Sequence, residues 1–162
     1  MFGGPAGGGG EEAAAGFSYG EHTADLQVIG WGPERNEAIR QVLLGIMALI
    51  APEGCLEARQ TIEARVSAPD PVAALVQAAN ELLFLVDTEG FVATDVLVSE
   101  DPGRAAGADT VSLLLELRGA PVFAEGAVPS GPVPKAATYH EALLDPDRAA
   151  PWRWRARLTL DL

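Results

Sequence analysis

The chain has 162 residues, enough for one domain with a substantial core and marginal for two. Its formal net charge of -12 argues against a free-standing nucleic-acid binder, because such proteins draw their affinity from basic contacts to phosphates. The single cysteine, Cys55, excludes a disulfide framework or a cysteine-rich zinc site within one chain, and no apolar run approaches the roughly 20 residues of a membrane span. The acidic surface is either simply well solvated or suited to hard cations, and any role on RNA is expected to run through a partner.

Residues 1–16 are mostly Gly and Ala, with two acids at Glu11 and Glu12. Such a stretch buries too little apolar surface to offset the entropy of ordering it. We therefore expect residues 1–16 to form a disordered tail, followed by a single domain over residues 17–162. The N-terminus lacks the basic and apolar regions of a secretory signal, so we expect a soluble, cytoplasmic protein.

Two amphipathic helices are predicted in the first half of the domain. Strand material over residues 17–29 leads through a turn at residues 30–33, and Pro33 suits the first position of a helix. Apolar residues recur there every three or four positions, which predicts one core face: Ile39, Val42, Leu43, Ile46, Met47 and Ile50. An alternating strand over residues 61–66 separates this helix from the next.

The second helix has clear start and stop signals. Asp70 and Pro71 suit the cap and the first helical position, and Gly90 is placed for a left-handed cap at the other end. Between them runs a core stripe: Val72, Leu75, Val76, Ala79, Leu82, Leu83 and Val86.

Four alternating segments after Gly90 predict strands, at residues 92–98, 111–117, 135–144 and 152–160. A loop rich in proline and glycine over residues 119–134 divides them, and a turn at residues 145–147 precedes the last strand. Strict alternation in the third segment would place His140 on the face of Thr138, with Tyr139 on the other face. Strand, helix, strand, helix and then several mainly antiparallel strands make an α+β fold.

The stretch Glu21-His22-Thr23-Ala24-Asp25 brings two acids, an imidazole and a hydroxyl to the entrance of an apolar strand. Polar residues at such a position gather at sheet ends, where loops and functional sites lie. The same residues also make an ordinary capped turn, because Thr and Asp satisfy backbone donors there. Both interpretations remain open from this stretch alone.

Asp25 and Asp161 are the leading candidates for chemistry, because both lie at the end of a predicted strand. If the first and last strands pair, these ends can meet. Two carboxylates and the Leu162 carbonyl would then form an all-oxygen site, which suits Ca²⁺, Mg²⁺ or Mn²⁺ rather than Zn²⁺. The alternative is a pair of exposed strand-end acids that bind nothing.

The only two histidines, His22 and His140, each adjoin an acid, Glu21 and Glu141. They are either an acid–base pair or hydrogen-bonded structural histidines at a sheet end. The sequence has no nucleophile elbow, phosphate-binding loop or dinucleotide-binding fingerprint.

The one basic concentration is a stripe along the last predicted strand, formed by Arg153, Arg155 and Arg157. It is either the solvated outer face of an edge strand or a contact surface. A contact surface of this kind could meet an acidic partner or a nucleotide phosphate.

Four sequence blocks occur in the order and spacing of a known family: Glu21-His22-Thr23-Ala24-Asp25, Glu81-Leu82-Leu83-Phe84-Leu85-Val86-Asp87-Thr88-Glu89-Gly90, Lys135-Ala136-Ala137-Thr138-Tyr139-His140 and Leu160-Asp161-Leu162. With these blocks the chain resembles the archease family across residues 17–162. Any one block is weak, but four in order are specific. The proline-rich residues 119–134 and the glycine-rich tail depart from the family pattern.

The resemblance implies an accessory protein of the tRNA-splicing RNA ligase. That ligase joins a 2′,3′-cyclic phosphate or 3′-phosphate end to a 5′-hydroxyl end, with GTP and a divalent metal. An archease promotes the guanylylation and turnover of the ligase and is not itself an enzyme. The implied fold is strand–helix–strand–helix followed by strands, in β/β/α layers.

The resemblance also implies a metal site, at positions that correspond here to Asp25, Asp161 and Leu162. The expected ion is Ca²⁺, with Mg²⁺ or Mn²⁺ as alternatives, and RNA is reached only through the ligase. Nearby motif residues are expected to support the site or contact the ligase: Glu21, His22, Thr23, Lys135, Thr138, Tyr139 and His140. Two other functions stay open, a small metal-dependent hydrolase using Asp25, Asp161 and a histidine base, and a chaperone-like binding protein.

Overall fold

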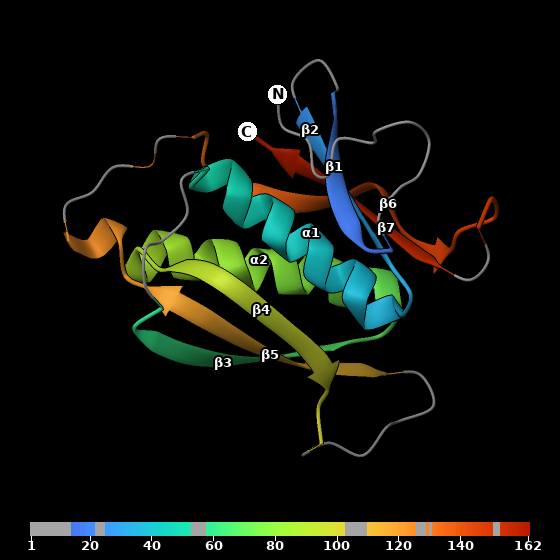
Figure 1. Cartoon of the computed structure of the whole chain (residues 1–162), viewed down its shortest axis with the longest axis horizontal. Helices are drawn as coiled ribbons and strands as arrows, with labels where there is room; N and C mark the ends of the chain where they lie inside the picture. Colours follow the sequence, from blue (N-terminus) through green and yellow to red (C-terminus); the bar gives the residue numbers. More distant parts are fainter. Residues whose placement is uncertain are drawn as a thin grey trace.

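The computed structural model describes residues 14–21, 25–52, 58–102, 110–125, 129, 131–150 and 153–162. Within them lie, in chain order, β1 (Gly16–Glu21), β2 (Asp25–Gly32), α1 (Arg35–Ile50), β3 (Gln60–Ala68), α2 (Pro71–Glu89), β4 (Val92–Glu100), β5 (Val111–Ala120), the 3-10 helix η2 (Phe123–Glu125), β6 (Ala136–Pro146) and β7 (Trp154–Asp161) (Figure 1). Residues 1–13, Cys55 and Trp152 lie outside the described residues, so the expected tail and the domain boundary at residue 17 stay predictions. No helix among the described residues is long and apolar enough to cross a membrane.

The two helices lie between two antiparallel sheets, as Figure 1 shows. One sheet has the strand order β1-β2-β7-β6 and the other the order β3-β5-β4. Helix α1 packs against β2 and β7 on one side and β4 on the other, while α2 packs against β6 on one side and β3 and β5 on the other. The α+β class is confirmed. The layer order is sheet–helices–sheet, where the resemblance implied β/β/α.

Because they lie between two sheets, both helices are buried on more than one face. The predicted stripe of α1 is buried, and so are Ala38, Gly45 and Leu49 outside it. A helix covered on two sides needs an apolar surface nearly all round. Part of the buried surface of α1 consists of small residues such as Ala38 and Gly45. The predicted core face, which followed large apolar side chains, did not include them.

Strand β2 extends further than the sequence indicated. Gly30 and Trp31 lie within it, not in the predicted turn, and α1 begins at Arg35 instead of Pro33. Packing explains the difference. A Cβ atom on Gly30 would lie 2.6 Å from the Ala38 carbonyl oxygen, so glycine here allows the strand to approach the helix.

Both ends of α2 agree with the sequence prediction. The Oδ1 atom of Asp70 accepts a hydrogen bond of 2.8 Å from the Ala73 amide, and Pro71 is the first helical residue. At the other end Gly90 has a φ of 62°, a conformation that glycine adopts without strain. Its amide donates to the Val86 carbonyl and closes the last turn.

Strand β6 contains a wide bulge that breaks the predicted alternation. Thr138 pairs with Thr159 and Leu143 with Arg157, so residues 139–142 of β6 face only one residue of β7. Tyr139, His140 and Glu141 are consequently all exposed, and the prediction that alternate faces continue through this segment was wrong. The predicted turn at residues 145–147 also begins later, because β6 runs to Pro146.

An ion pair between Asp147 and Arg153 stabilises the connection from β6 to β7. The Nη2 and Nε atoms of Arg153 lie 2.6 and 3.0 Å from Oδ2 of Asp147, and both side chains are largely buried. Arg153 also lies over the Trp31 ring, with its Cζ 5.8 Å from the ring centroid. The hydrogen bond from Arg153, and after it one from the Ala149 amide, lower the pKa of Asp147 from its ordinary value of 3.8.

We expect Arg153→Ala to lower the free energy of unfolding at pH 7 by about 2 kcal/mol, because it leaves the buried Asp147 carboxylate without its main donor. A carboxyl group whose pKa is lowered by folding stabilises the protein above its unfolded pKa, and this contribution is lost as pH falls through the folded pKa. The difference between wild type and Arg153→Ala should therefore shrink at pH 3. Urea unfolding at pH 7 and pH 3 measures it, with Arg148→Ala, exposed in the same loop, as control. An undiminished difference at pH 3 contradicts this account.

Candidate functional site

The two candidate metal ligands lie opposite each other. Strand β2 pairs with β7 in antiparallel register, and the register places Asp25 directly across from Asp161. Residues opposed in this way have their Cβ atoms about 5 Å apart and their side chains on one face of the sheet. Asp161 is exposed and Asp25 half-exposed, so both carboxylates are open to solvent. The sequence placed these acids at strand ends, and the pairing brings them together.

The backbone of Asp161 is held from both sides. Strand β7 lies between β2 and β6, and Ala136 of β6 is the second residue paired with Asp161. The amide of Lys135 donates a hydrogen bond of 2.7 Å to the Asp161 carbonyl. One predicted supporting residue thus orients the chain that carries a candidate ligand.

The donor set fits a hard divalent cation. Asp25 and Asp161 supply carboxylate oxygens, and the Leu162 carbonyl follows immediately along the chain. Within the described ranges no third histidine, cysteine, aspartate or glutamate joins them. Ca²⁺ and Mg²⁺ take oxygen ligands and readily keep waters, so two carboxylates at an open sheet end suit them better than Zn²⁺, which prefers nitrogen and sulfur.

The remaining members of the first motif cannot be placed. His22 and Thr23 lie outside the described residues, and Glu21 is described only as the last residue of β1. Their predicted supporting roles stay predictions. The same holds for an acid–base pair of His22 with His140.

Three residues of the third block, Thr138, Tyr139 and His140, lie at the bulge of β6. The Thr138 hydroxyl donates to the Thr159 carbonyl at 3.3 Å and accepts from the His140 amide at 3.3 Å. The Thr159 hydroxyl donates to the His140 carbonyl at 2.8 Å. These contacts hold His140 through its backbone, and 60% of Tyr139 is exposed. Both side chains are thereby presented outward beside the strand that carries Asp161.

Glu141 and Gln27 form a contact that sequence reasoning missed. The Gln27 amide nitrogen donates to the Glu141 carboxylate at 2.7 Å, and Arg157 Nε donates to the Glu141 carbonyl at 2.8 Å. Glu141 has a φ of 54°, which is uncommon for a residue other than glycine. A glutamine inside an otherwise apolar strand, buried to 8% exposure, was the available signal.

The arginine stripe is not the outer face of an edge strand, because β7 lies inside its sheet. Arg153 is engaged by Asp147 and Trp31, and Arg157 by the Glu141 backbone. Arg155 is the exposed member. Two of the three side chains therefore have intramolecular roles.

Asn80 of α2 is the second residue that sequence reasoning missed. Its Nδ2 donates to the Ala137 carbonyl at 3.1 Å, and its Oδ1 accepts from the Ala137 amide at 2.8 Å. The side chain thus pairs with β6 as a neighbouring strand would. Ala137 opposes Leu160, so Asn80 fixes the start of β6 one position from Asp161. A polar residue within the apolar stripe of a helix was the only hint in the sequence.

Comparison with known proteins agrees with this architecture. The model of the Archease protein family (MTH1598/TM1083) matches residues 17–162. An archease of Thermococcus gammatolerans is 32% identical over 145 residues, covering 88% of this chain and 95% of that protein. An archease of Pyrococcus furiosus is 30% identical over 148 residues, with coverage of 88% and 95%.

Two solved structures share the fold. The solution structure of Methanobacterium thermoautotrophicum protein 1598 has a TM-score of 0.72 at 23% identity, over 91% of this chain and 99% of that one. The crystal structure of an archease from Thermotoga maritima has a TM-score of 0.52 at 14% identity, over 88% and 94%. By the family match and the identity to its relatives, the chain belongs to the archease family.

Proposed function

We propose that this protein is a non-enzymatic, metal-binding activator of the tRNA-splicing RNA ligase, and that it promotes the ligase's GTP-dependent guanylylation and repeated turnover. Family membership supports the partner. The observation that carries the metal site is the register of β2 and β7, which sets Asp25 opposite Asp161 at an open sheet end.

The roles of the chain's own residues follow from that geometry. Asp25 and Asp161 would hold the cation through their carboxylate oxygens, and the Leu162 carbonyl would be the third protein ligand. A divalent cation bound there would supply positive charge to neutralise GTP phosphates. Lys135 and the β6 bulge hold the site in place, and Tyr139 and His140 face outward toward the partner.

The deciding experiment measures the ligase with and without this protein. Formation of the ligase–GMP adduct and the number of RNA ends joined per ligase should both rise when the protein is added. No change in either would reject the proposed function. Phosphoester hydrolysis by the protein alone would favour the metal-dependent hydrolase, and an equal effect on unrelated aggregating proteins would favour the chaperone-like binder.

We expect the isolated protein to have no appreciable affinity for tRNA. Its net charge of -12 opposes the phosphate contacts that supply most nucleic-acid affinity. A gel shift with labelled tRNA, at micromolar protein and low salt, measures this, and the ligase serves as positive control. A salt-sensitive shift produced by the protein alone would contradict the prediction.

A further inference from the structure

Strand β3 forms one edge of its sheet, and the hydrogen bonds of its neighbour β5 show which of its backbone groups face outward. The Gly119 carbonyl of β5 is turned toward β3, because it accepts from the Arg59 amide. The Ser112 carbonyl of β5 is turned toward β4, because it accepts from the Asp101 amide. Since backbone direction alternates along a strand, the odd-numbered residues of β5 bond to β3 and the even-numbered residues bond to β4.

The outward-facing groups of β3 follow from its register with β5. The even-numbered residues of β3 lie opposite the odd-numbered residues of β5 and bond to them. The N–H and C=O groups of the intervening residues therefore point away from the sheet: Thr61, Glu63, Arg65 and Ser67. Among the described residues no hydrogen bond reaches these backbone groups. A row of unpaired backbone groups is a site at which another strand can pair.

Two other sheet edges are closed by side chains of the helices. On β4 the Val96 carbonyl accepts a hydrogen bond of 2.6 Å from Nε of Arg40 in α1. On β6 the Asn80 side chain of α2 pairs with the amide and carbonyl of Ala137. Strand β3 is described over its full length, and it has no such contact, no proline and no bulge. These devices prevent strands from pairing, so their absence leaves β3 open to a partner.

The charges of β3 make the strand complementary to a second copy of itself. When two β3 strands pair in antiparallel register about Ala64, Glu63 of each copy lies opposite Arg65 of the other. Thr61 of each copy then lies opposite Ser67 of the other. All four of these residues face outward, so they form the hydrogen-bonded pairs of this register. The two copies of Ala64 form the closer, non-hydrogen-bonded pair at the axis, where a small side chain fits.

The same charges exclude the neighbouring registers. A shift of two residues in one direction sets Glu63 opposite its own copy, and a shift in the other direction sets Arg65 opposite its own copy. Like charges that lie directly opposite each other destabilise a strand pair. Within its own chain Glu63 lies opposite another acid, Glu116 of β5. Pairing about Ala64 therefore places a cation on the side of Glu63 that β5 does not occupy.

Arg65 can take part in this pairing while it keeps its contact within the chain. Its Nη1 atom donates to the Asp101 carboxylate. The Arg65 side chain is nevertheless 56% exposed, and a guanidinium has five N–H donors. Further N–H groups of Arg65 are therefore available to Glu63 of a second copy.

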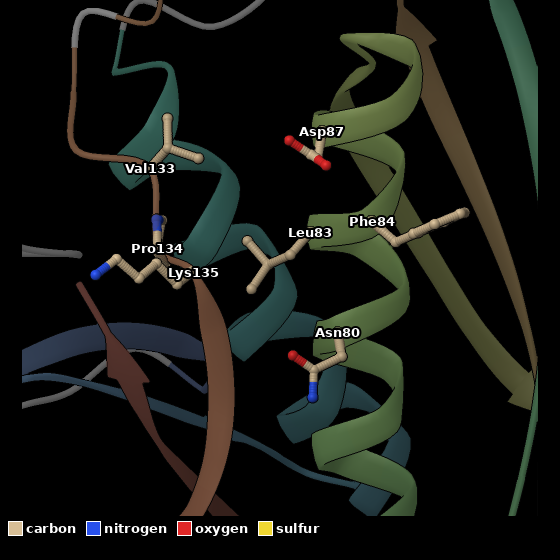
Figure 2. A pocket seen from close by; sticks show the side chains of 7 residues that line it. All are labelled: Asn80, Leu83, Phe84, Asp87, Val133, Pro134 and Lys135. Carbon is tan, nitrogen blue, oxygen red and sulfur yellow. The ribbon is translucent and has the colours of Figure 1, made fainter.

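Helix α2 is placed to extend the contact. It covers β3 and β5 while α1 lies against β4, so the side of α2 away from α1 is also the side of the open edge. Figure 2 shows Phe84 projecting from α2 away from the segment that leads into β6, and Phe84 is 58% exposed. Two strand spacings would separate α2 from its copy by about 10 Å, which is the distance between packed helices. Phe84 is thus a large apolar side chain on the helix that borders the open edge.

We propose that the protein forms a two-fold dimer in which two β3 strands pair about Ala64 and join two three-stranded sheets into one continuous sheet. Strand β3 belongs to the sheet that lies across the helix layer from Asp25 and Asp161 (Figure 1). The dimer therefore leaves both proposed metal sites open to the ligase. This inference does not depend on the proposed function.

The first test is the mass of the full-length protein, measured by sedimentation equilibrium from micromolar to millimolar concentration. The mass of wild type should rise from that of a monomer to that of a dimer. Glu63→Lys sets like charges opposite each other in both symmetry-related pairs and should weaken the dimer about tenfold or more. Asp145→Lys makes the same change of charge on exposed β6 and should associate as wild type does.

A second pair of variants tests the backbone pairing. Thr61→Pro removes an outward-facing N–H group without removing a bond to β5, and it should also weaken the dimer. Thr61→Ser keeps the N–H group and should leave the dimer unchanged. The side chains of Thr61 and Glu63 are exposed, so circular dichroism of their variants should match wild type.

Cross-linking tests the register. Thr61→Cys and Ser67→Cys proteins, each in a Cys55→Ser background, are mixed under mild oxidation. The proposed register sets these two positions opposite each other at a separation that a disulfide spans. The mixture should therefore form a disulfide-linked dimer, whereas Thr61→Cys alone should not. Linkage in Thr61→Cys alone, with none in the mixture beyond it, would overturn the register.

Two results would overturn the dimer itself. One is a monomer at every concentration, and the other is a dimer that Glu63→Lys and Thr61→Pro leave unchanged. If wild type stays monomeric and these two variants instead weaken its binding to the ligase, the edge pairs with a strand of the ligase and the inference is wrong.

Discussion

Asp25→Ala and Asp161→Ala should each abolish stimulation of ligase guanylylation while the protein stays folded. Each change removes one of the two opposed carboxylates of the proposed site, and no third acidic, histidine or cysteine side chain joins them among the described residues. With one acid left, affinity for Ca²⁺ or Mg²⁺ should fall at least about tenfold, because charge count sets the affinity of such sites. Strand-end acids contribute little to the core, so circular dichroism and thermal unfolding should change little.

The experiment pairs two measurements on each variant. Isothermal titration of Ca²⁺ and Mg²⁺ reports on the site alone, and the rate of ligase–GMP formation reports on function. Asp145→Ala is the matched control, since Asp145 is exposed on β6 and opposes Arg155, away from Asp161. Full stimulation by folded Asp25→Ala and Asp161→Ala proteins would reject the metal site as the basis of activation. Normal metal affinity in both would reject the ligand assignment.

The expected loss has a physical basis in the proposed function, in which an open metal site would complete the chemistry of another protein. Guanylylation requires positive charge near the GTP phosphates and correct orientation of the attacking group. We expect the Asp25–Asp161 end to lie near the ligase's nucleotide site in the complex. Arg155, the exposed arginine of β7, is the member of the stripe still available to contact acidic residues of the ligase.

Asn80→Ala should both destabilise the protein and weaken metal binding. Asn80 satisfies the amide and the carbonyl of Ala137, whose side chain is 5% exposed. Removing it leaves two poorly hydrated backbone groups without partners, at a cost of about 1–3 kcal/mol each at most. Because β6 is hydrogen-bonded to Asp161 near its start, a looser β6 should also lower cation affinity at the site.

Urea unfolding and Ca²⁺ titration on the same preparations test this. Asn80→Asp retains the acceptor for the Ala137 amide and should fall between wild type and Asn80→Ala. Gln77→Ala, on the exposed face of the same helix, is the control for helix effects. If Asn80→Ala loses stability but binds Ca²⁺ with wild-type affinity, the link between β6 and the metal site is wrong.

Much of the architecture could be predicted from local sequence. Apolar spacing identified α1 and α2, Asp70 and Gly90 marked the ends of α2, and alternation identified β3 and β5. These signals are reliable because caps and period depend on neighbouring residues. Where the chain departs from its regular period, prediction failed: bulges between Ala93 and Asp95 and within β6 put consecutive residues on faces that alternation does not allow.

The candidate site, like the fold, was predictable from the sequence only in part. Residue type and position at strand ends singled out Asp25 and Asp161 from the sequence alone, because polar residues after apolar strands lie at sheet ends. That they face each other is decided by a register between strands more than 120 residues apart, as the pairing of Asp25 with Asp161 records. The roles of Asn80 and Gln27 likewise exist only in the folded chain, since each side chain contacts a segment distant in sequence. Local residue chemistry therefore determined which side chains could bind a cation. Only long-range strand pairing and helix packing decided which of these side chains lie together, because strand register and the contacts between layers are set by the whole core rather than by neighbours in the chain.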